Sequence, residues 1–138
     1  MIAVENPPLA FKVAETGFAL ANALNAQVYL VHVNPSALLY TPDSGMSATQ
    51  IEANMVQQTE ELLQQITKLY AGSLEPIPLV LEGNIEKELL TAIQDIQPDL
   101  LVLGTHAKKP WKEMLLGSVS EDLVRNSTCP VMLIRESE

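Results

Sequence analysis

The residues of this chain most able to do chemistry lie in the segment 100–120. Its first four residues are apolar and are typical of a buried strand, which ends at Gly104. A loop then leads to Gly117 and Ser118, after which the apolar residues have helical spacing. The first backbone N–H groups of a helix lack internal partners, and the helix dipole favours negative charge there. Because glycine lets a ligand approach the backbone closely, the segment predicts a phosphate or other anion site.

The charges of the chain are distributed unevenly around this segment. The net charge is −9, which argues against nucleic acid as a general partner. Three of the six lysines nevertheless lie inside the glycine loop, at Lys108, Lys109 and Lys112. They are either a solvated surface or a local attraction for an anion, and the sequence leaves both interpretations open.

Three stretches of the C-terminal half resemble the signature of the universal stress protein family. They are the residues 104–106, 115–121 and 129–131. Nucleotide-binding members of that family show Gly, two residues, Gly, nine residues, Gly, and then Ser or Thr. Gly104, Gly117 and Ser118 match this pattern at the family spacing, whereas Ala107 replaces the second glycine.

The resemblance implies a fold and a ligand. The implied fold is α/β, an open five-stranded parallel sheet of order 3-2-1-4-5 with helices on both faces, of the adenine nucleotide alpha hydrolase-like class. The implied ligand is ATP or a related adenine nucleotide at the switch point between strands 1 and 4, with Mg²⁺ or Mn²⁺ held through its phosphates. The residues that the resemblance places at the nucleotide are Ala3, Glu5, Val33, Leu103, Gly104, His106, Ala107, Gly117, Ser118, Val119 and Ser120.

Individual roles follow from the same resemblance. Glu5 takes the place of the acidic residue that meets the base or ribose, although a solvated carboxylate at a strand end is an equal alternative. The backbone of Val33 would lie against the adenine, and His106 would pack beside the nucleotide. The backbone N–H groups of the loop and the hydroxyls of Ser118 and Ser120 would hold the phosphates. A competing interpretation of Ser118 is a capping box with Glu121, three residues further on.

Ala107 separates two functions. If its position requires a positive φ, alanine carries a strain of roughly 1 kcal/mol, which weakens binding about tenfold or less. A nucleotide-binding regulatory module is therefore the favoured function. The alternative is a dimeric stress-response interaction module that binds no nucleotide.

An enzymatic function has little support in the sequence. Hydrolysis of ATP needs a residue that positions water. His106, Glu5 and Glu113 are candidates, but none has an evident activating partner in the sequence. No His, Cys or carboxylate set has metal-ligand spacing either. We therefore expect at most slow, incidental hydrolysis.

Hydrophobic spacing predicts five strands alternating with four helices. The strands are expected at 1–4, 27–33, 76–81, 100–103 and 131–134, and the helices at 7–25, 47–71, 84–97 and from 118 onward. Short right-handed crossovers then give a parallel sheet with helices on both faces.

Helix ends and faces can also be predicted. Asn6 is expected to cap the first helix with Pro7 inside it, Thr49 and Glu52 to form a capping box, and Asn84 to cap the third helix. The residues expected on one apolar face of the long second helix are Ile51, Met55, Leu62, Ile66 and Leu69.

The overall properties predict a single domain, 1–138, in the cytoplasm. The chain has 138 residues, one cysteine at Cys129, no run long enough to span a membrane and no leader-like start. The last strand is expected at an edge of the sheet. Val131–Arg135 is therefore expected to pair with a second copy, as this family usually dimerises.

Overall fold

The computed structural model describes residues 1–36, 45–106 and 117–136. Ala107, the loop lysines and Glu113 lie outside the described residues. The sheet contains the strands β1 (Ile2–Ala3), β2 (Tyr29–Asn34), β3 (Ile77–Glu82), β4 (Leu101–Thr105) and β5 (Val131–Arg135). The helices are α1 (Leu9–Leu24), α2 (Ala48–Tyr70), α3 (Ile85–Ile96) and α4 (Ser118–Asn126).

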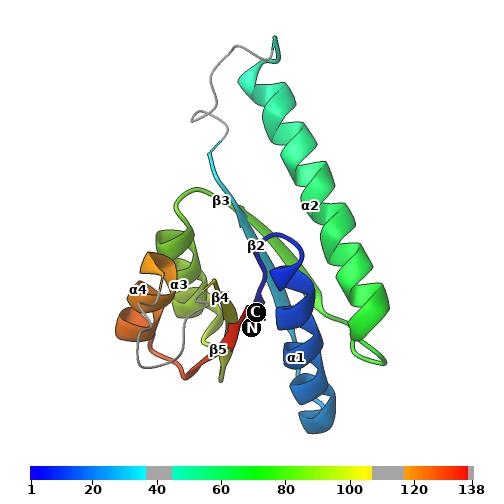
Figure 1. Cartoon of the computed structure of the whole chain (residues 1–138), viewed down its shortest axis with the longest axis vertical. Coiled ribbons are helices and arrows are strands. Elements are labelled where there is room, and N and C mark those ends of the chain that lie inside the picture. The colour runs from blue at the N-terminus through cyan, green and yellow to red at the C-terminus, as the bar shows by residue number, and fades with distance from the viewer. Residues whose placement is uncertain (37–44, 107–116, 137–138) are drawn as a thin grey trace.

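All neighbouring strands are parallel, and their order is β3-β2-β1-β4-β5, which confirms the predicted fold class. Helices α1 and α2 cover one face of the sheet, and α3 and α4 cover the other (Figure 1). The long helix α2 extends well past the carboxyl ends of the strands in this view. No helix among the described residues is both long and apolar enough to cross a membrane.

The central strand β1 is short but has a neighbour on each side. Ile2 pairs with Leu30 and Val102 and faces α1 and α2, whereas Ala3 pairs with the next residue of each neighbour and faces α3 and α4. Successive strand residues point to opposite faces, so this two-residue strand contributes to both cores. The chain continues past it as Val4 and Glu5, at the carboxyl edge of the sheet.

Two predicted helix caps are wrong, although α2 begins close to residue 47 as predicted. Helix α1 begins at Leu9 with Pro8 as its N-cap and no side-chain cap, rather than at Pro7 with Asn6 as the cap. Pro7 precedes another proline, and ring clashes disfavour the helical conformation in such a residue. Helix α2 is capped by Ser47, whose hydroxyl accepts from the Gln50 N–H at 3.2 Å, while the Gln50 side chain accepts from the Ser47 N–H at 2.9 Å.

Other local predictions are confirmed in part. Asn25 ends α1 in the left-handed conformation with φ 50°, and the Asn84 side chain caps α3 by accepting from the Lys87 N–H at 3.0 Å. The predicted apolar face of α2 is wrong at Leu69, which is 57% exposed. The face that is actually buried contains Thr59, Leu63 and Ile66, because a helical repeat of 3.6 residues turns Leu69 away from this face.

Candidate functional site

The carboxyl ends of β1 and β4 form the switch point of this sheet. After β1 the chain turns to α1 on one face, and after β4 it leads to α4 on the other face. In open parallel sheets, ligands bind in the crevice that these diverging connections leave open. The crevice at this switch point is therefore the first place to look for a site.

Three pockets adjoin here, and all are bordered by Glu5 and Ile85. The outer pocket has a volume of ≈ 370 Å³, within the roughly 300–1,000 Å³ usual for small-molecule sites. Its lining is Glu5, Ile85, Gly104, Thr105, His106, Gly117, Ser118, Val119 and Ser120. The side pocket has a volume of ≈ 600 Å³, and its lining is Glu5, Asn6, Pro7, His32, Val33, Asn34, Pro35, Met55, Gln58, Thr59, Leu62 and Ile85. The inner pocket is mostly apolar and holds only ≈ 20 Å³, about the space of one water molecule, with the lining Ala3, Val4, Glu5, Val31, Val33, Ile85, Leu89 and Leu103.

The structure brings together the described residues that the sequence singled out. Ala3, Val33 and Leu103 lie at the inner pocket, and the remaining described candidates lie at the outer one, with Glu5 at both. Ala107 lies outside the described residues. Segments far apart in the chain thus meet at one edge of the sheet, as parallel strands require.

Gly104 has a packing role that its sequence pattern does not reveal. A Cβ atom on this residue would lie 2.8 Å from Val13 Cγ2 and 2.9 Å from Leu9 Cδ2, both on α1. Contacts this short do not occur between real carbon atoms, so α1 can pack on β4 only where a glycine stands. The sequence predicts that Gly104 is a glycine so that a ligand can approach the backbone. On the side where a Cβ atom would stand, this prediction is wrong, because α1 occupies that space.

Gly117 has the opposite surroundings. Its φ is −58°, which any residue can adopt, and among the described residues a Cβ atom built on it would meet nothing within 4 Å. It is the N-cap of α4, and no side chain of the described residues caps this helix with a hydrogen bond. Ser118 is the first residue of the helix, so the predicted Ser118–Glu121 capping box is wrong. Glu121 instead accepts from Arg125 at 2.7 Å, one helical turn further on.

Thr105 and Ile85 are site residues that sequence reasoning missed. Thr105 is 2% exposed and borders the outer pocket, and its hydroxyl makes no hydrogen bond within the described part of the chain. Buried hydroxyls are normally hydrogen-bonded, so this one stands out. One signal in the sequence could have identified Thr105 as a site residue, namely its place at the carboxyl end of a buried strand. Ile85 is the first residue of α3, directly after the Asn84 cap.

A histidine and two carboxylates meet at the mouth of the outer pocket. His106 Nε2 lies 3.0 Å from Glu5 Oε2, and His106 Nδ1 lies 3.3 Å from Glu136 Oε2. We call Glu5, His106 and Glu136 the carboxylate–histidine bridge. The hydrogen bond with Glu5 has the largest effect and raises the pKa of His106 above its ordinary value; burial opposes it with the next largest effect, and the hydrogen bond with Glu136 raises the pKa further. The sequence shows no evident activating partner for His106, and the structure places two carboxylates beside it.

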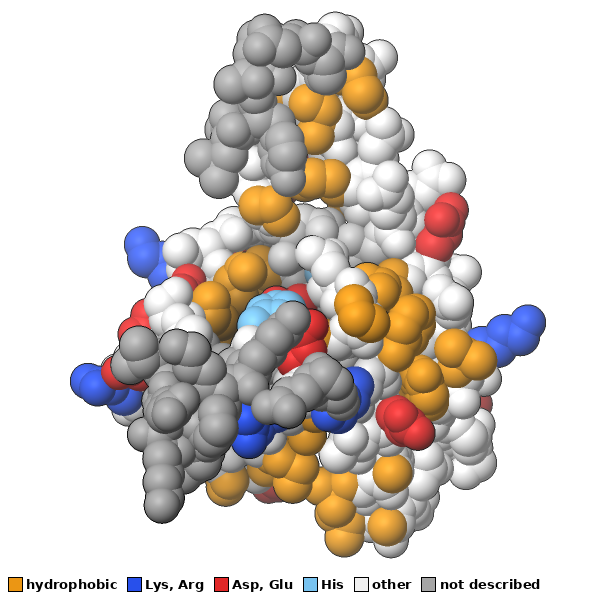
Figure 2. Space-filling view, in the orientation of Figure 1, with side chains coloured by type: hydrophobic (Ala, Val, Ile, Leu, Met, Phe, Trp, Pro, Cys, Tyr) orange, Lys and Arg blue, Asp and Glu red, His pale blue; other side chains and the backbone are white. Residues whose placement is uncertain are grey.

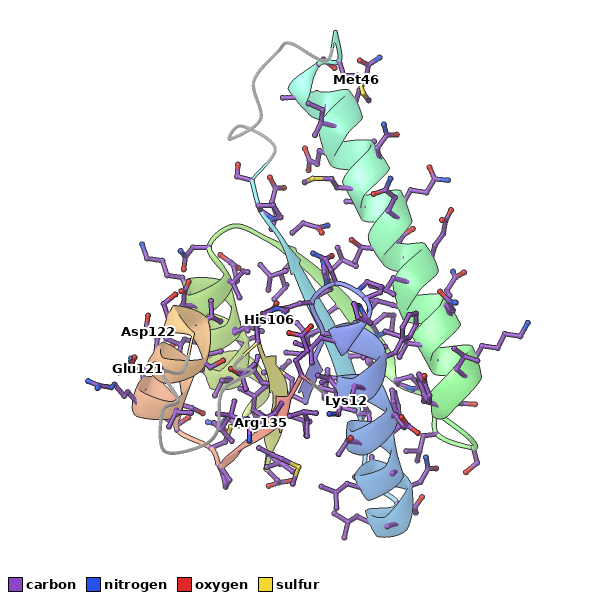
Figure 3. All side chains as sticks on the ribbon, viewed as in Figure 1. Lys12, Met46, His106, Glu121, Asp122 and Arg135 are labelled. Atoms are coloured by element: carbon purple, nitrogen blue, oxygen red, sulfur yellow. The ribbon has the colours of Figure 1, made fainter. Side chains whose placement is uncertain are left out.

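The surroundings of the bridge are visible on the surface. Figure 2 shows a histidine ring on this face with acidic side chains directly beside it. Figure 3 shows His106 near the centre of the molecule, where the strands end. Among the described residues, no cluster of three or more His, Cys, Asp or Glu side chains is suited to holding a metal ion.

Fold and site together define a doubly wound parallel α/β domain with a ligand crevice at its switch point. The sequence model of the universal stress protein family matches residues 1–135, and the chain belongs to this family.

Known relatives agree with this assignment. Universal stress protein MJ0531 of Methanocaldococcus jannaschii is 25% identical over 138 residues, which cover 99% of this chain and 81% of that protein. The solved structure of MJ0577 superimposes with a TM-score of 0.78 at 19% identity, covering 99% of this chain and 96% of the other.

Two further solved structures carry ligands. A universal stress protein in complex with cAMP superimposes with a TM-score of 0.64 at 19% identity, covering 97% of this chain and 94% of the other. The universal stress protein from Archaeoglobus fulgidus in complex with dAMP has a TM-score of 0.63 at 18% identity, covering 96% and 95%. At these identities the likeness establishes the fold.

Proposed function

We propose that this protein is a stress-response regulatory module that binds ATP or a related adenine nucleotide in the switch-point crevice. The observation that carries the proposal is the meeting of the side pocket of ≈ 600 Å³ with the glycine- and serine-lined outer pocket at Glu5 and Ile85. A nucleotide has the same division, because its base is flat and largely apolar while its phosphates are anionic. Family members with bound cAMP and dAMP support the same ligand class.

Each part of the nucleotide has a matching part of the crevice. The base fits the side pocket of ≈ 600 Å³, which Val33 borders, whereas the inner pocket of ≈ 20 Å³ is too small for it. The Glu5 carboxylate accepts hydrogen bonds from ribose hydroxyls. The phosphates face the start of α4, where Ser118 adds a hydroxyl to the helix dipole. Mg²⁺ or Mn²⁺ would be held through the phosphates and would neutralise part of their charge.

Isothermal titration of ATP with Mg²⁺ tests the proposal. We expect micromolar binding by the native chain, and binding up to about tenfold tighter by an Ala107→Gly variant, because glycine removes any strain of alanine at that loop position. Binding by the glycine variant alone would mean that the native chain acts as an interaction module instead. Absence of heat with both proteins would refute nucleotide binding.

We also propose a homodimer that forms through β5. The hydrogen bonds from Leu101 N to Pro130 O and from Glu136 N to Thr105 O turn the even-numbered residues of β5 toward β4. The backbones of Val131 and Leu133 therefore face the open edge of the sheet. At the other edge, the odd-numbered residues of β3 face β2, which leaves Pro78 outward without an N–H to offer. The β5 edge is thus the better template for a second copy.

A proline at Leu133 tests the dimer. We expect Leu133→Pro to convert a dimer into a monomer in analytical ultracentrifugation, because it removes an outward N–H at the centre of the edge. The separated subunit should lose some stability, because Leu133 packs against the core, but less than the Ile134→Pro protein, since the bonds of β5 to β4 use the even-numbered residues. Ile134→Pro is the matched control and should disrupt the sheet itself. A native chain that sediments as a monomer would contradict the proposal.

We further propose that the protein acts in the cytoplasm. Cys129 is a free thiol, as expected in a reducing compartment.

A further inference from the structure

The carboxylate–histidine bridge joins three segments that are distant in the chain. Glu5 follows β1, His106 follows β4, and Glu136 follows β5. The Glu5 side chain is 31% exposed and the His106 side chain 62% exposed, so the bridge lies at the surface, over the pocket that both residues border.

A complete bridge requires one particular protonation state of the histidine. Ionised carboxylates only accept hydrogen bonds, and a neutral imidazole carries one N–H. Both ring nitrogens of His106 lie within hydrogen-bond distance of a carboxylate oxygen, at 3.0 Å and 3.3 Å. Only the doubly protonated, cationic ring can donate to Glu5 and Glu136 at once. The bridge is therefore complete only when His106 carries an extra proton.

The bridge occupies one of the two oxygens of the Glu5 carboxylate. Glu5 Oε2 lies 3.0 Å from His106 Nε2, and both residues border the outer pocket. A ribose hydroxyl that donates to this oxygen must compete with the imidazolium for it. A bulky, charged donor already in place is displaced only at a cost in binding free energy.

We propose that the carboxylate–histidine bridge is a proton-controlled gate of the crevice, so that protonated His106 opposes the binding of ribose-bearing ligands and loss of its proton admits them. This inference rests on the proposed nucleotide site. It adds that binding at this site is regulated by pH, in the range where histidine titrates.

The direction of the pH dependence follows from the bonds of the bridge. The folded protein raises the pKa of His106, chiefly through the hydrogen bond with Glu5. The bridge is thus fully formed below the ordinary histidine value and is lost as the pH rises through the raised one. The adjoining elements also carry Lys12 on α1 and Arg135 on β5 (Figure 3), and Glu121 on α4 pairs with Arg125. The two carboxylates of the bridge are the charged groups in direct contact with the ring.

Adenosine is the appropriate probe because it is neutral between about pH 5.5 and pH 8, whereas phosphates would be attracted to the imidazolium. We expect His106→Ala to bind adenosine about two- to fivefold tighter than the native chain near pH 5.5, the effect of an exposed, charge-assisted ion pair. Near pH 8 the two proteins should bind alike. Glu136→Gln should behave as an intermediate, and Glu61→Gln, an exposed carboxylate on α2, should match the native chain at both pH values.

The outcomes separate the gate from the nucleotide site. Adenosine affinity that is the same for native and His106→Ala protein at both pH values would overturn the gate and leave ATP binding intact. Weaker adenosine binding by His106→Ala near pH 5.5 would also overturn it, since the histidine would then assist the ligand. If ATP binds but adenosine does not, the Glu5–ribose contact is too weak to be gated, and the inference is wrong. If neither ligand binds, the proposed function and the gate are both refuted.

Discussion

We expect replacement of Gly104 by alanine to lower the free energy of unfolding by roughly 1–3 kcal/mol, the usual cost of adding atoms to a well-packed core. The new methyl group would lie 2.8 Å from Val13 Cγ2 and 2.9 Å from Leu9 Cδ2. Leu9 and Val13 are 3% and 1% exposed, so they cannot move into solvent. The helix α1 must therefore shift away from β4. Urea unfolding followed by circular dichroism measures the loss.

Gly17, a second glycine at the interface between α1 and the sheet, provides a comparison in which a smaller loss of stability is expected. A Cβ atom on Gly17 would meet one side chain, that of Ile2, with Cδ1 at 2.8 Å and Cγ1 at 3.0 Å. We expect Gly17→Ala to cost less than Gly104→Ala, because the new methyl group crowds one buried side chain instead of two. A Gly104→Ala protein as stable as the native chain would contradict the packing role of this glycine.

The second large effect is expected at Gly117, on ligand binding and not on stability. Gly117→Asp should lower ATP affinity about a hundredfold or more, because a carboxylate would stand where the phosphates are proposed to lie. Residues 1–36, 45–106 and 118–136 leave room for the side chain, since none of their atoms lies within 4 Å of a Cβ atom there. Aspartate is also a better N-cap than glycine, so stability should stay equal or rise by a few tenths of a kcal/mol.

Asparagine at the same position separates charge from shape. Gly117→Asn caps α4 in the same way and has nearly the same size, so its ATP affinity should lie between those of the native chain and Gly117→Asp. Titration calorimetry and thermal unfolding of the three proteins make the comparison. Equal ATP affinity of the native and aspartate proteins would place the phosphates away from α4 and contradict the proposed arrangement.

The contrast between Gly104 and Gly117 shows how far a motif can be interpreted from sequence. Both glycines match one family pattern, and the sequence suggests one reason for both. The structure gives them different reasons, because β4 turns the Cβ side of Gly104 toward α1, whereas Gly117 stands in open space at a helix start. Which way a strand residue points depends on register and on the helix packed above it.

Helix ends were predictable only in part, for a similar reason. Asn25 and Asn84 end and begin their helices as predicted, since no better cap competes nearby. The predicted cap at Ser118 failed because α4 begins one residue earlier than such a cap requires, with Gly117 as the N-cap and Ser118 already inside the helix. Several short polar residues in one segment can each cap a helix, and the packing of the helix decides among them.

The sequence by itself determined the alternation of strands and helices, and with the family resemblance it determined the strand order and the edge at which the candidate residues meet. These features depend on local periodicity and on the common direction of parallel strands. Only the tertiary structure decided that Glu5, His106 and Glu136 form one bridge, that Thr105 is buried without a hydrogen-bond partner among the described residues, and that Gly104 serves helix packing. Glu5 and His106 are 101 positions apart, and contacts between such distant residues arise from the register and twist of the sheet, which no local pattern encodes.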